Sequence, residues 1–230
     1  MMRRKLIFFS ICTLLISMLP ATVRAQYGFK KKKVEQVLPD STAFFNGVAV
    51  SVDLLSPAML WLGDYGGFEG AVRVNLKDRW FPIFEAGYGK TDHEAPATQT
   101  SYRTSAPYFR LGGDYNIMKD KHDDYRLYAG LRYAMTNFKF DIENSRMSDP
   151  VWGNNVPFEV HDAKGHYHWL EVCFGVDAKI MGPLHLGWSV RYKNRLFYDE
   201  GLMDHCWYVP GFGKSAKTAI GGTFNVIIDL

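Results

Sequence analysis

Residues 169–192 contain two alternating segments joined by a short turn, and this feature constrains the fold most strongly. The segments read WLEVCFGVDAKI and LHLGWSVRY, and the turn is Met181-Gly182-Pro183. Strict alternation of apolar and polar residues indicates β-strands, and a Gly-Pro turn between them indicates a hairpin. Each segment has about 9 to 12 residues, which is the length that a tilted transmembrane strand needs. We therefore expect a membrane hairpin with an apolar face toward lipid and a polar face toward the interior.

The same alternation recurs in further segments, at residues 48–55, 68–76, 80–90, 107–117, 125–138 and 218–230. The connections are alternately short and long, as in bacterial outer-membrane barrels, which have short periplasmic turns and longer extracellular loops. The longer loops are expected at residues 56–67, 91–106, 141–165 and 194–216. The sequence therefore predicts an all-β fold, an eight-stranded antiparallel transmembrane up-and-down β-barrel with four extracellular loops and both termini in the periplasm. Interfacial aromatic girdles are expected from Trp80, Tyr88, Tyr108, Tyr125, Trp169 and Tyr192.

The N-terminus has the pattern of a secretory signal peptide. A basic segment precedes an apolar run of about 14 residues, and Val23 and Ala25 occupy positions −3 and −1 of a small-residue cleavage site. This run is short for a membrane anchor. The expected division of the chain is a signal peptide at residues 1–25, a basic periplasmic tail at 26–46 and the barrel at 47–230. The tail carries Lys30–Lys33, but the net charge of +3 gives no nucleic-acid signature.

Charged residues of both signs lie on the strand faces that are expected to point inward. The acidic residues are Asp53, Glu69, Glu85, Asp114, Glu171 and Asp177, and the basic residues are Arg73, Arg110, Arg126, Arg132, Lys179 and Arg191. An eight-stranded barrel is just wide enough for side chains to fill its interior, and buried charges are costly unless they are paired. We therefore expect a lumen plugged by paired charges rather than an ion path, and a function located on the loops or the rim.

Several residues of the expected loops are candidates for contact or chemistry. Four aromatic residues either form a contact surface or pack the loops on one another: Trp61, Trp152, Trp207 and Tyr208. His166 and His168 share one face of a strand, as metal ligands can. Such a pair is more often polar rim, so we predict neither a metal nor a cofactor. Cys173 and Cys206 can pair only if the loop carrying Cys206 folds into the barrel.

Two alternatives stay open. The first is an enzyme at the barrel rim that modifies lipid or lipopolysaccharide. His185 and Ser189 both face inward, but about 13 Å of strand separates them, too far for a nucleophile and its base, and the chain has no Gly-x-Ser-x-Gly segment. We therefore predict no enzymatic activity. The second alternative is a soluble lipocalin-like binding protein, whose apolar strand faces would point inward and whose charges would point outward.

Segments along nearly the whole chain after the expected signal peptide resemble a family of small Gram-negative outer-membrane proteins with no assigned function. They read NGVAVSVDLLSP, GGFEGAVRVNLKDRWFPIFEAGYGK, SAPYFRLGGDYN, YRLYAGLRYA, PVWGNNVPFE, HWLEVCFGVDAKI and HLGWSVRYKNRL. The architecture is similar to OmpA/OmpX-like eight-stranded barrels. The resemblance implies an outer-membrane location and offers no catalytic residue. We expect a monomer in contact with outer-membrane lipid and lipopolysaccharide, assembled by the barrel-assembly machinery through its C-terminal strand, with an unidentified extracellular ligand.

Overall fold

The predicted hairpin at residues 169–192 is present in the computed structural model, as β6 (Asn155–Met181) and β7 (Leu184–Asp199). The two strands pair antiparallel, and Gly182 in the turn between them has a φ of +56°, a conformation that glycine adopts without steric cost. The structure describes residues 42–148, 155–200 and 206–230, which belong to one unit of the chain. The expected signal peptide, the Lys30–Lys33 segment and Trp152 lie outside the described residues.

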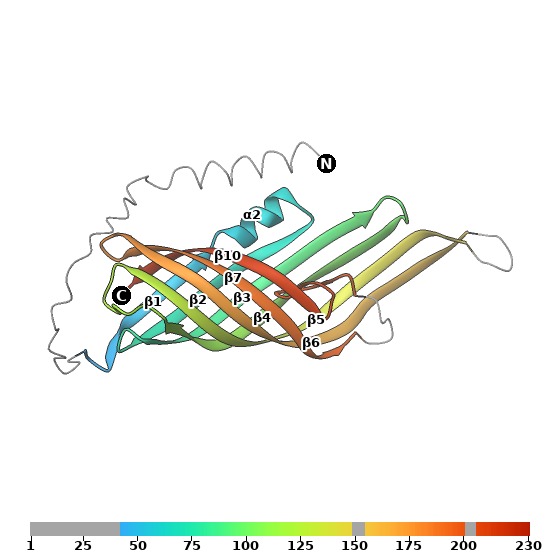
Figure 1. Ribbon diagram of the computed structural model, residues 1–230. Helices are drawn as coiled ribbons and strands as arrows, with labels where there is room; N and C mark the ends of the chain where they lie inside the picture. The colour runs from blue at the N-terminus through green and yellow to red at the C-terminus, as the bar shows by residue number, and fades with distance from the viewer. Residues whose placement is uncertain (1–41, 149–154, 201–205) are drawn as a thin grey trace, which may run out of the picture. The chain divides into compact units, whose positions relative to one another are not determined.

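Eight strands close into a ring in the order β1-β10-β7-β6-β5-β4-β3-β2 (Figure 1). The other six are β1 (Phe45–Asp53), β2 (Tyr65–Leu76), β3 (Trp80–Ala95), β4 (Thr100–Asn116), β5 (Tyr125–Ser148) and β10 (Thr218–Asp229). All neighbours in the ring are antiparallel, and β1 closes it by pairing with β10. The predicted eight-stranded up-and-down barrel is confirmed.

Apolar side chains cover the outside of the ring, and charged side chains fill much of the inside. On β6, Phe174 is 58% exposed on the outer face, whereas Glu171 is buried on the inner face. On β7, Val190 is exposed and Arg191 is buried. A lipocalin-like protein would have the opposite arrangement, so that alternative is wrong.

Two of the aromatic residues predicted for the girdles are inside the barrel instead. Tyr108 and Trp169 are both buried, whereas Trp80, Tyr88 and other predicted girdle residues are exposed on the outer face. Trp169 shares the strand face of Glu171, and side chains two apart along a strand point the same way. Strand parity therefore decides the position of these rings, and closeness to a strand end does not.

Two of the predicted loops are largely strand. β3 and β4 continue to Ala95 and Thr100, and β5 and β6 continue to Ser148 and Asn155, so that two hairpins project from the ring (Figure 1). Apolar and polar residues alternate along a strand where one of its faces is buried or contacts lipid. Beyond the membrane both faces of a strand can meet water, so the sequence pattern fades although the ladder of hydrogen bonds continues.

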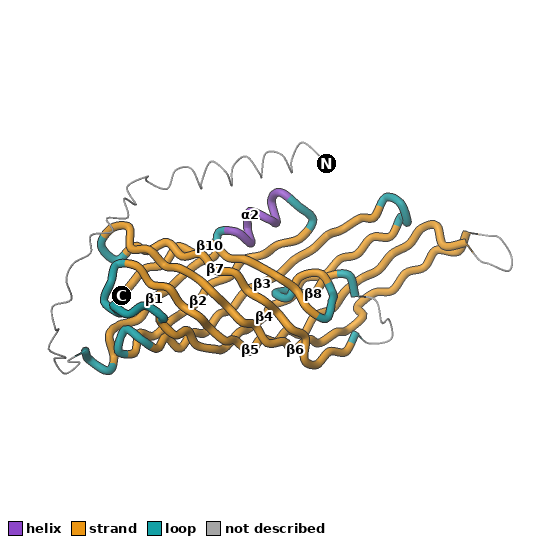
Figure 2. Tube along the Cα trace, in the orientation of Figure 1, coloured by secondary structure: helices purple, strands orange, loops and turns teal. Residues whose placement is uncertain are grey.

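The other two predicted loops contain short elements. The connection after β1 holds the helix α2 (Leu55–Leu62), which is drawn outside the ring in Figure 2. The connection after β7 holds β8 (Tyr208–Val209) and β9 (Gly213–Lys214), which pair with each other. Within residues 42–148, 155–200 and 206–230, no helix is long and apolar enough to span a membrane.

Candidate functional site

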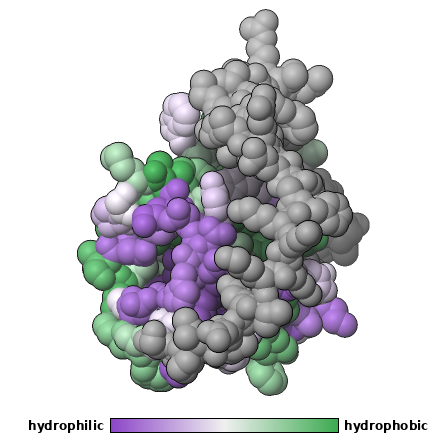
Figure 3. Space-filling view, turned by 60° about the vertical axis from the view of Figure 1, so that its left-hand side comes forward, coloured by the Kyte–Doolittle hydropathy of each residue, from purple (hydrophilic) through white to green (hydrophobic). Residues whose placement is uncertain are grey.

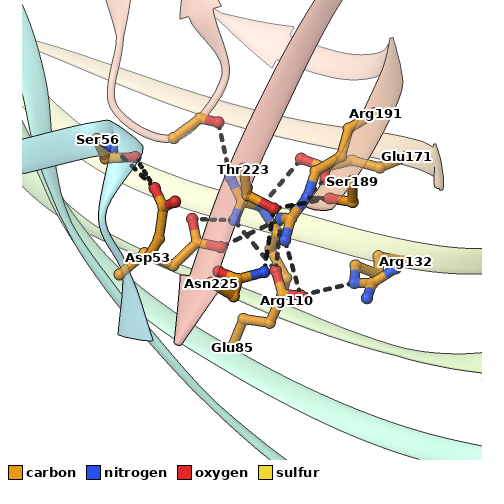
Figure 4. A network of polar contacts seen from close by, with 12 residues as sticks. Asp53, Ser56, Glu85, Arg110, Arg132, Glu171, Ser189, Arg191, Thr223 and Asn225 are labelled. Carbon is orange, nitrogen blue, oxygen red and sulfur yellow. Dashed lines mark hydrogen bonds and ion pairs between the residues drawn. The ribbon is translucent and has the colours of Figure 1, made fainter. Parts of the chain in front are cut away.

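Glu85 on β3 lies at the centre of a charge network inside the barrel (Figure 4). The residue is only 1% exposed. Its carboxylate accepts hydrogen bonds from Arg132 Nε at 2.7 Å, Arg191 Nη1 at 2.7 Å and Arg110 Nη1 at 3.1 Å. These arginines come from β5, β7 and β4, so the network ties distant parts of the ring together. Charge-assisted hydrogen bonds of this kind offset the cost of burying the ions.

Two further carboxylates extend the network toward the projecting hairpins. Glu69 accepts hydrogen bonds from Arg110 and, at 2.8 Å, from the Tyr108 hydroxyl. Glu171 accepts one from Trp169 Nε1 at 2.6 Å and lies 2.9 Å from Arg110 Nε. A buried tyrosine hydroxyl or indole N–H usually finds a polar partner. The two carboxylates are these partners, which explains why Tyr108 and Trp169 lie inside rather than in the girdles.

A second cluster lies near the end of the barrel that carries the short turns. Asp177 on β6 accepts hydrogen bonds from Arg73 Nη1 and Arg126 Nε, each at 3.0 Å. The Arg126 guanidinium lies 4.0 Å from the centre of the Phe81 ring, a cation–π contact. Asp114 on β4 pairs with Arg132 at 3.0 Å and so connects toward Glu85. The predicted inward charges therefore form connected groups on the described strands.

Two predicted members of the network have other roles. Asp53 bonds to the start of α2 rather than to a cation: its carboxylate accepts from the N–H of Leu55 at 3.1 Å, and from the N–H of Ser56 at 2.9 Å and its hydroxyl. It therefore caps the first turn of α2. Lys179 is 44% exposed and pairs with Asp124 at 3.7 Å at the short-turn end. Lys179 lies two residues before the end of β6, at the mouth of the barrel. Alternation along a strand predicts the side of the wall that a residue faces, but not its depth in the barrel.

Lys193 is a further buried cation of the interior and lies just beyond the predicted end of its strand. Its Nζ donates to the carbonyl oxygens of Gly211 at 2.7 Å and Phe212 at 3.1 Å, and it lies 4.0 Å from Glu171 Oε1. The predicted strand ended at Tyr192. Continuing the alternation one step beyond Arg191 would have placed Lys193 inside.

A hairpin from the connection between β7 and β10 folds into the barrel. We call residues 206–214, which include β8 and β9, the inner hairpin. Val209 and Phe212 are fully buried in it. Gly211 has a φ of +79°, and an added Cβ there would lie 2.5 Å from the Tyr108 ring. Its carbonyl accepts a hydrogen bond from Arg110 Nη2 at 2.9 Å, so the hairpin tip rests directly on the charge network.

The inner hairpin corrects the prediction for Tyr208, which is buried and therefore offers no contact surface. Trp207 is partly buried and stacks on the His93 ring, with centroids 3.9 Å apart and planes within 2°. Trp207 therefore packs a loop on a strand, as the packing alternative predicts. Trp61 on α2 is 84% exposed.

The two cysteines are free and buried. The loop that carries Cys206 does enter the barrel, but there its thiol meets the Tyr102 hydroxyl at 3.0 Å and donates to the Tyr208 carbonyl at 3.1 Å. Burial raises the pKa of the Cys206 thiol to about 12. The thiol is therefore neutral at physiological pH and has little nucleophilic character.

A polar cavity of about 470 Å³ opens at the short-turn end. Side chains of both signs line it, including Asp78, Arg126, Lys179 and His185. Figure 3, which brings this end forward, shows hydrophilic residues bordered by hydrophobic ones. The interior thus passes from a polar mouth through the charge network to the aromatic inner hairpin.

The two histidines considered as metal ligands, His166 and His168, lie on β6. His168 Nδ1 lies 2.7 Å from the Tyr133 hydroxyl, and its ring centre is 6.1 Å from that of His166. Among the described residues, no group of three or more His, Cys, Asp and Glu side chains could hold a metal ion. His185 pairs with Asp229 at 2.9 Å.

Ser189 and His185 do not act on each other in the described barrel. The Ser189 hydroxyl shares a hydrogen bond of 2.7 Å with Thr223 on β10, away from the imidazole of His185. A nucleophile and its base need direct contact. This pair therefore gives no support to a hydrolase at the rim.

An apolar outer face, a charged inner face and ring closure are the features by which a β-structure spans a membrane without unsatisfied backbone groups. They make this chain an outer-membrane β-barrel protein. Two solved structures are similar to it, each at 13% sequence identity and over 80% of this chain. One is Ail, the attachment invasion locus protein of Yersinia pestis in complex with the heparin analogue sucrose octasulfate, with 93% of that chain covered and a TM-score of 0.37. The other is a major outer membrane protein from Thermus thermophilus, with 98% covered and a TM-score of 0.43.

No curated protein matches the chain. The model of a family described as a domain of unknown function, DUF6048, matches residues 5–229. Because the match covers nearly the full length, the chain belongs to the DUF6048 family.

Proposed function

We propose that this barrel acts at the cell surface through its projecting strand hairpins, in adhesion or in maintaining the envelope, and that its lumen conducts no solute. The length of β5 and β6 carries the proposal. These strands have 24 and 27 residues, whereas a transmembrane strand needs about 9 to 11. More than half of each strand is therefore available beyond the membrane, and strands of that length are not needed for anchoring alone.

The base of the projecting part is built to be stiff. Phe138, Phe140 and Tyr167 are buried there, and the Phe138 ring centre lies about 6 Å from each of the other two. The contact with Tyr167 is edge-to-face, and aromatic pairs of this kind add to the burial of apolar area. At the same level of the hairpin, exposed ion pairs join the strands, such as Lys139 with Asp162 at 2.9 Å. A rigid, charged hairpin is suited to present a fixed surface to a partner with little entropy lost on binding.

The contents of the lumen support the absence of conduction. Glu85 and Arg132 are buried across the middle of the barrel, and the inner hairpin lies on the Arg110 side of the network. A barrel of eight strands has little interior space beyond that of its own side chains. Solute transport would require these ion pairs to separate, at a cost of several kcal/mol for each desolvated charge.

The test removes the projecting hairpins while keeping the barrel. Phe140 pairs with Ala163, and Thr91 pairs with Thr104, so residues 141–162 or 92–103 can each be replaced by an Asn-Gly turn, which suits a two-residue hairpin. We expect both proteins to keep the heat-modifiable migration of a folded barrel. Cells that carry the 141–162 replacement should lose surface attachment or become sensitive to detergent.

The 92–103 replacement shows whether one hairpin or both are required. Cells with both replacements that attach and resist detergent like the wild type would contradict the proposal. The lipid A mass profile of the same strains separates the enzyme alternative, because a rim enzyme would change that profile and a surface-contact protein would not.

A further inference from the structure

β1 ends earlier than its two neighbours in the ring. Its last ladder pairs join Val52 to Gly70 of β2 and Asp53 to Asn225 of β10. β2 nevertheless begins at Tyr65, and β10 begins at Thr218. In the described barrel, residues 65–69 and 218–223 therefore have no partner strand on the side of β1. A stretch of five or six residues corresponds to about 17 to 20 Å of strand, located toward the projecting hairpins.

The helix α2 lies over this interruption. It starts directly after β1, and Asp53 holds the junction by accepting hydrogen bonds from the N–H groups of Leu55 and Ser56 and, at 2.9 Å, of Phe224 on β10. Figure 4 shows Asp53 reaching toward Ser56. One carboxylate thus joins the end of β1, the start of α2 and the edge of β10.

Gly66 of β2 shows on which side of the wall the helix lies. It shares the strand face of Phe68, which is exposed on the outside of the ring, yet Gly66 itself is buried. A Cβ added at Gly66 would lie 2.4 Å from the backbone nitrogen of Leu60 and 2.5 Å from the carbonyl oxygen of Ser56. The backbone of α2 therefore packs directly on the outer face of β2.

The exposed side of α2 continues the lipid-facing surface of the barrel. Residues 54–62 read LLSPAMLWL and include no charged side chain. Leu54 and Trp61 are exposed, and so are the outward-facing side chains Val52, Phe68 and Ile220 of the bordering strands β1, β2 and β10. Tryptophan is enriched where the hydrocarbon meets the head groups, so an exposed Trp61 suits a helix at that depth.

We infer that α2 is embedded in the outer leaflet of the membrane, where its exposed side contacts lipid acyl chains and its body covers the unpaired edges of β2 and β10. This inference rests on the proposed orientation, in which the projecting hairpins face the cell exterior. The occupant is lipid because the surface is uncharged and continuous with the lipid-facing strands. The covering has a physical purpose, since unpaired backbone groups cost several kcal/mol each in hydrocarbon.

Tryptophan quenching by brominated lipid tests the position of the helix. The protein is reconstituted in phosphatidylcholine vesicles that carry bromine either near the head group or near the chain end. The emission of Trp61 is obtained as the difference between wild type and Trp61→Phe. Trp188→Phe serves as the matched lipid-facing control, because Trp188 is exposed on the outer face of β7, and Trp207→Phe reports a residue of the inner hairpin.

We expect the Trp61 emission to fall about twofold or more with bromine near the head group, less with bromine near the chain end, and little with aqueous iodide. Quenching of Trp61 by iodide without quenching by lipid would place the helix in water and overturn the inference. Resistance to both quenchers would mean that protein covers the helix, which also overturns it. If Trp188 likewise escapes lipid quenching, the membrane placement of the barrel fails as well, so the two failures are distinguishable.

Discussion

Glu85 accepts hydrogen bonds from three arginines inside the barrel, so its replacement by glutamine isolates the contribution of one buried negative charge. Glu85→Gln keeps the shape of the side chain but leaves cations under-compensated, and we expect it to destabilise the barrel by about 3 to 5 kcal/mol. Glu143→Gln is the control, since Glu143 makes an exposed pair with Arg103 at 3.9 Å, worth about 1 kcal/mol or less. Urea unfolding in detergent measures both, and equal midpoints for the two variants would contradict the network's importance.

Because of Cys206, the stability of the barrel is expected to fall as the pH rises through the alkaline range. Burial raises the folded pKa of Cys206 to about 12, whereas a thiol in the unfolded chain ionises near pH 8.5. The folded state therefore retains a proton that the unfolded state releases, and the stabilisation is fully present below pH 8.5 and is lost as the pH rises toward 12. The expected loss from this group is about 1.4 kcal/mol per pH unit within that window. Cys206→Ala should lose less stability between pH 8 and 10 than the wild type does, and parallel curves would refute the assignment.

At the scale of elements, two glycines of β2 test the packing of α2. Gly66→Ala places a methyl group against the helix backbone, whereas at Gly70, on the same face of the same strand, the nearest atom to an added Cβ is the Ser51 carbonyl oxygen at 3.7 Å. We expect Gly66→Ala to cost about 1 to 3 kcal/mol as the helix is displaced, and Gly70→Ala to cost clearly less. Unfolding midpoints that rank the variants in the reverse order would show that α2 does not pack on β2.

The strands could be predicted because each membrane-facing strand carries its own evidence. In β6, Val172 and Phe174 alternate with Glu171 and Cys173, and this alternation can be recognised within the segment alone, without knowledge of the rest of the chain. The inward position of Glu85 follows from the same parity. Its partners do not, because which arginines reach it depends on the register between strands and the closure of the ring.

The short elements could not be predicted for a related reason. α2 is apolar apart from Ser56, and its eight residues are too few to reveal a helical period. The inner hairpin has no periodic signal, and its burial depends on space that other strands leave free. Gly89 of β3 provides such space, since a Cβ there would lie 2.9 Å from Pro210. Only the assembled ring brings these segments together.

At the scale of the whole molecule, the lumen is occupied by two structures of different origin. The charge network comes from the ring strands, and the inner hairpin comes from the connection between β7 and β10. They meet where Arg110 and Lys193 donate to the Gly211 carbonyl. Either structure could block the lumen to ions. The charge network is the stronger candidate, because its ion pairs around Glu85 join strands from different parts of the ring.

Removal of the inner hairpin therefore tests which structure prevents conduction. In a variant with residues 207–213 replaced by a short Gly-Ser linker, Lys193 loses both acceptor carbonyls of the hairpin, so we expect lower thermal stability. The ion pairs around Glu85 remain, and an eight-stranded barrel leaves little space around them. In planar bilayers, wild type and variant should both lack steady conductance. Stable openings only in the variant would assign the closure to the inner hairpin, and openings in the wild type would contradict a closed lumen altogether.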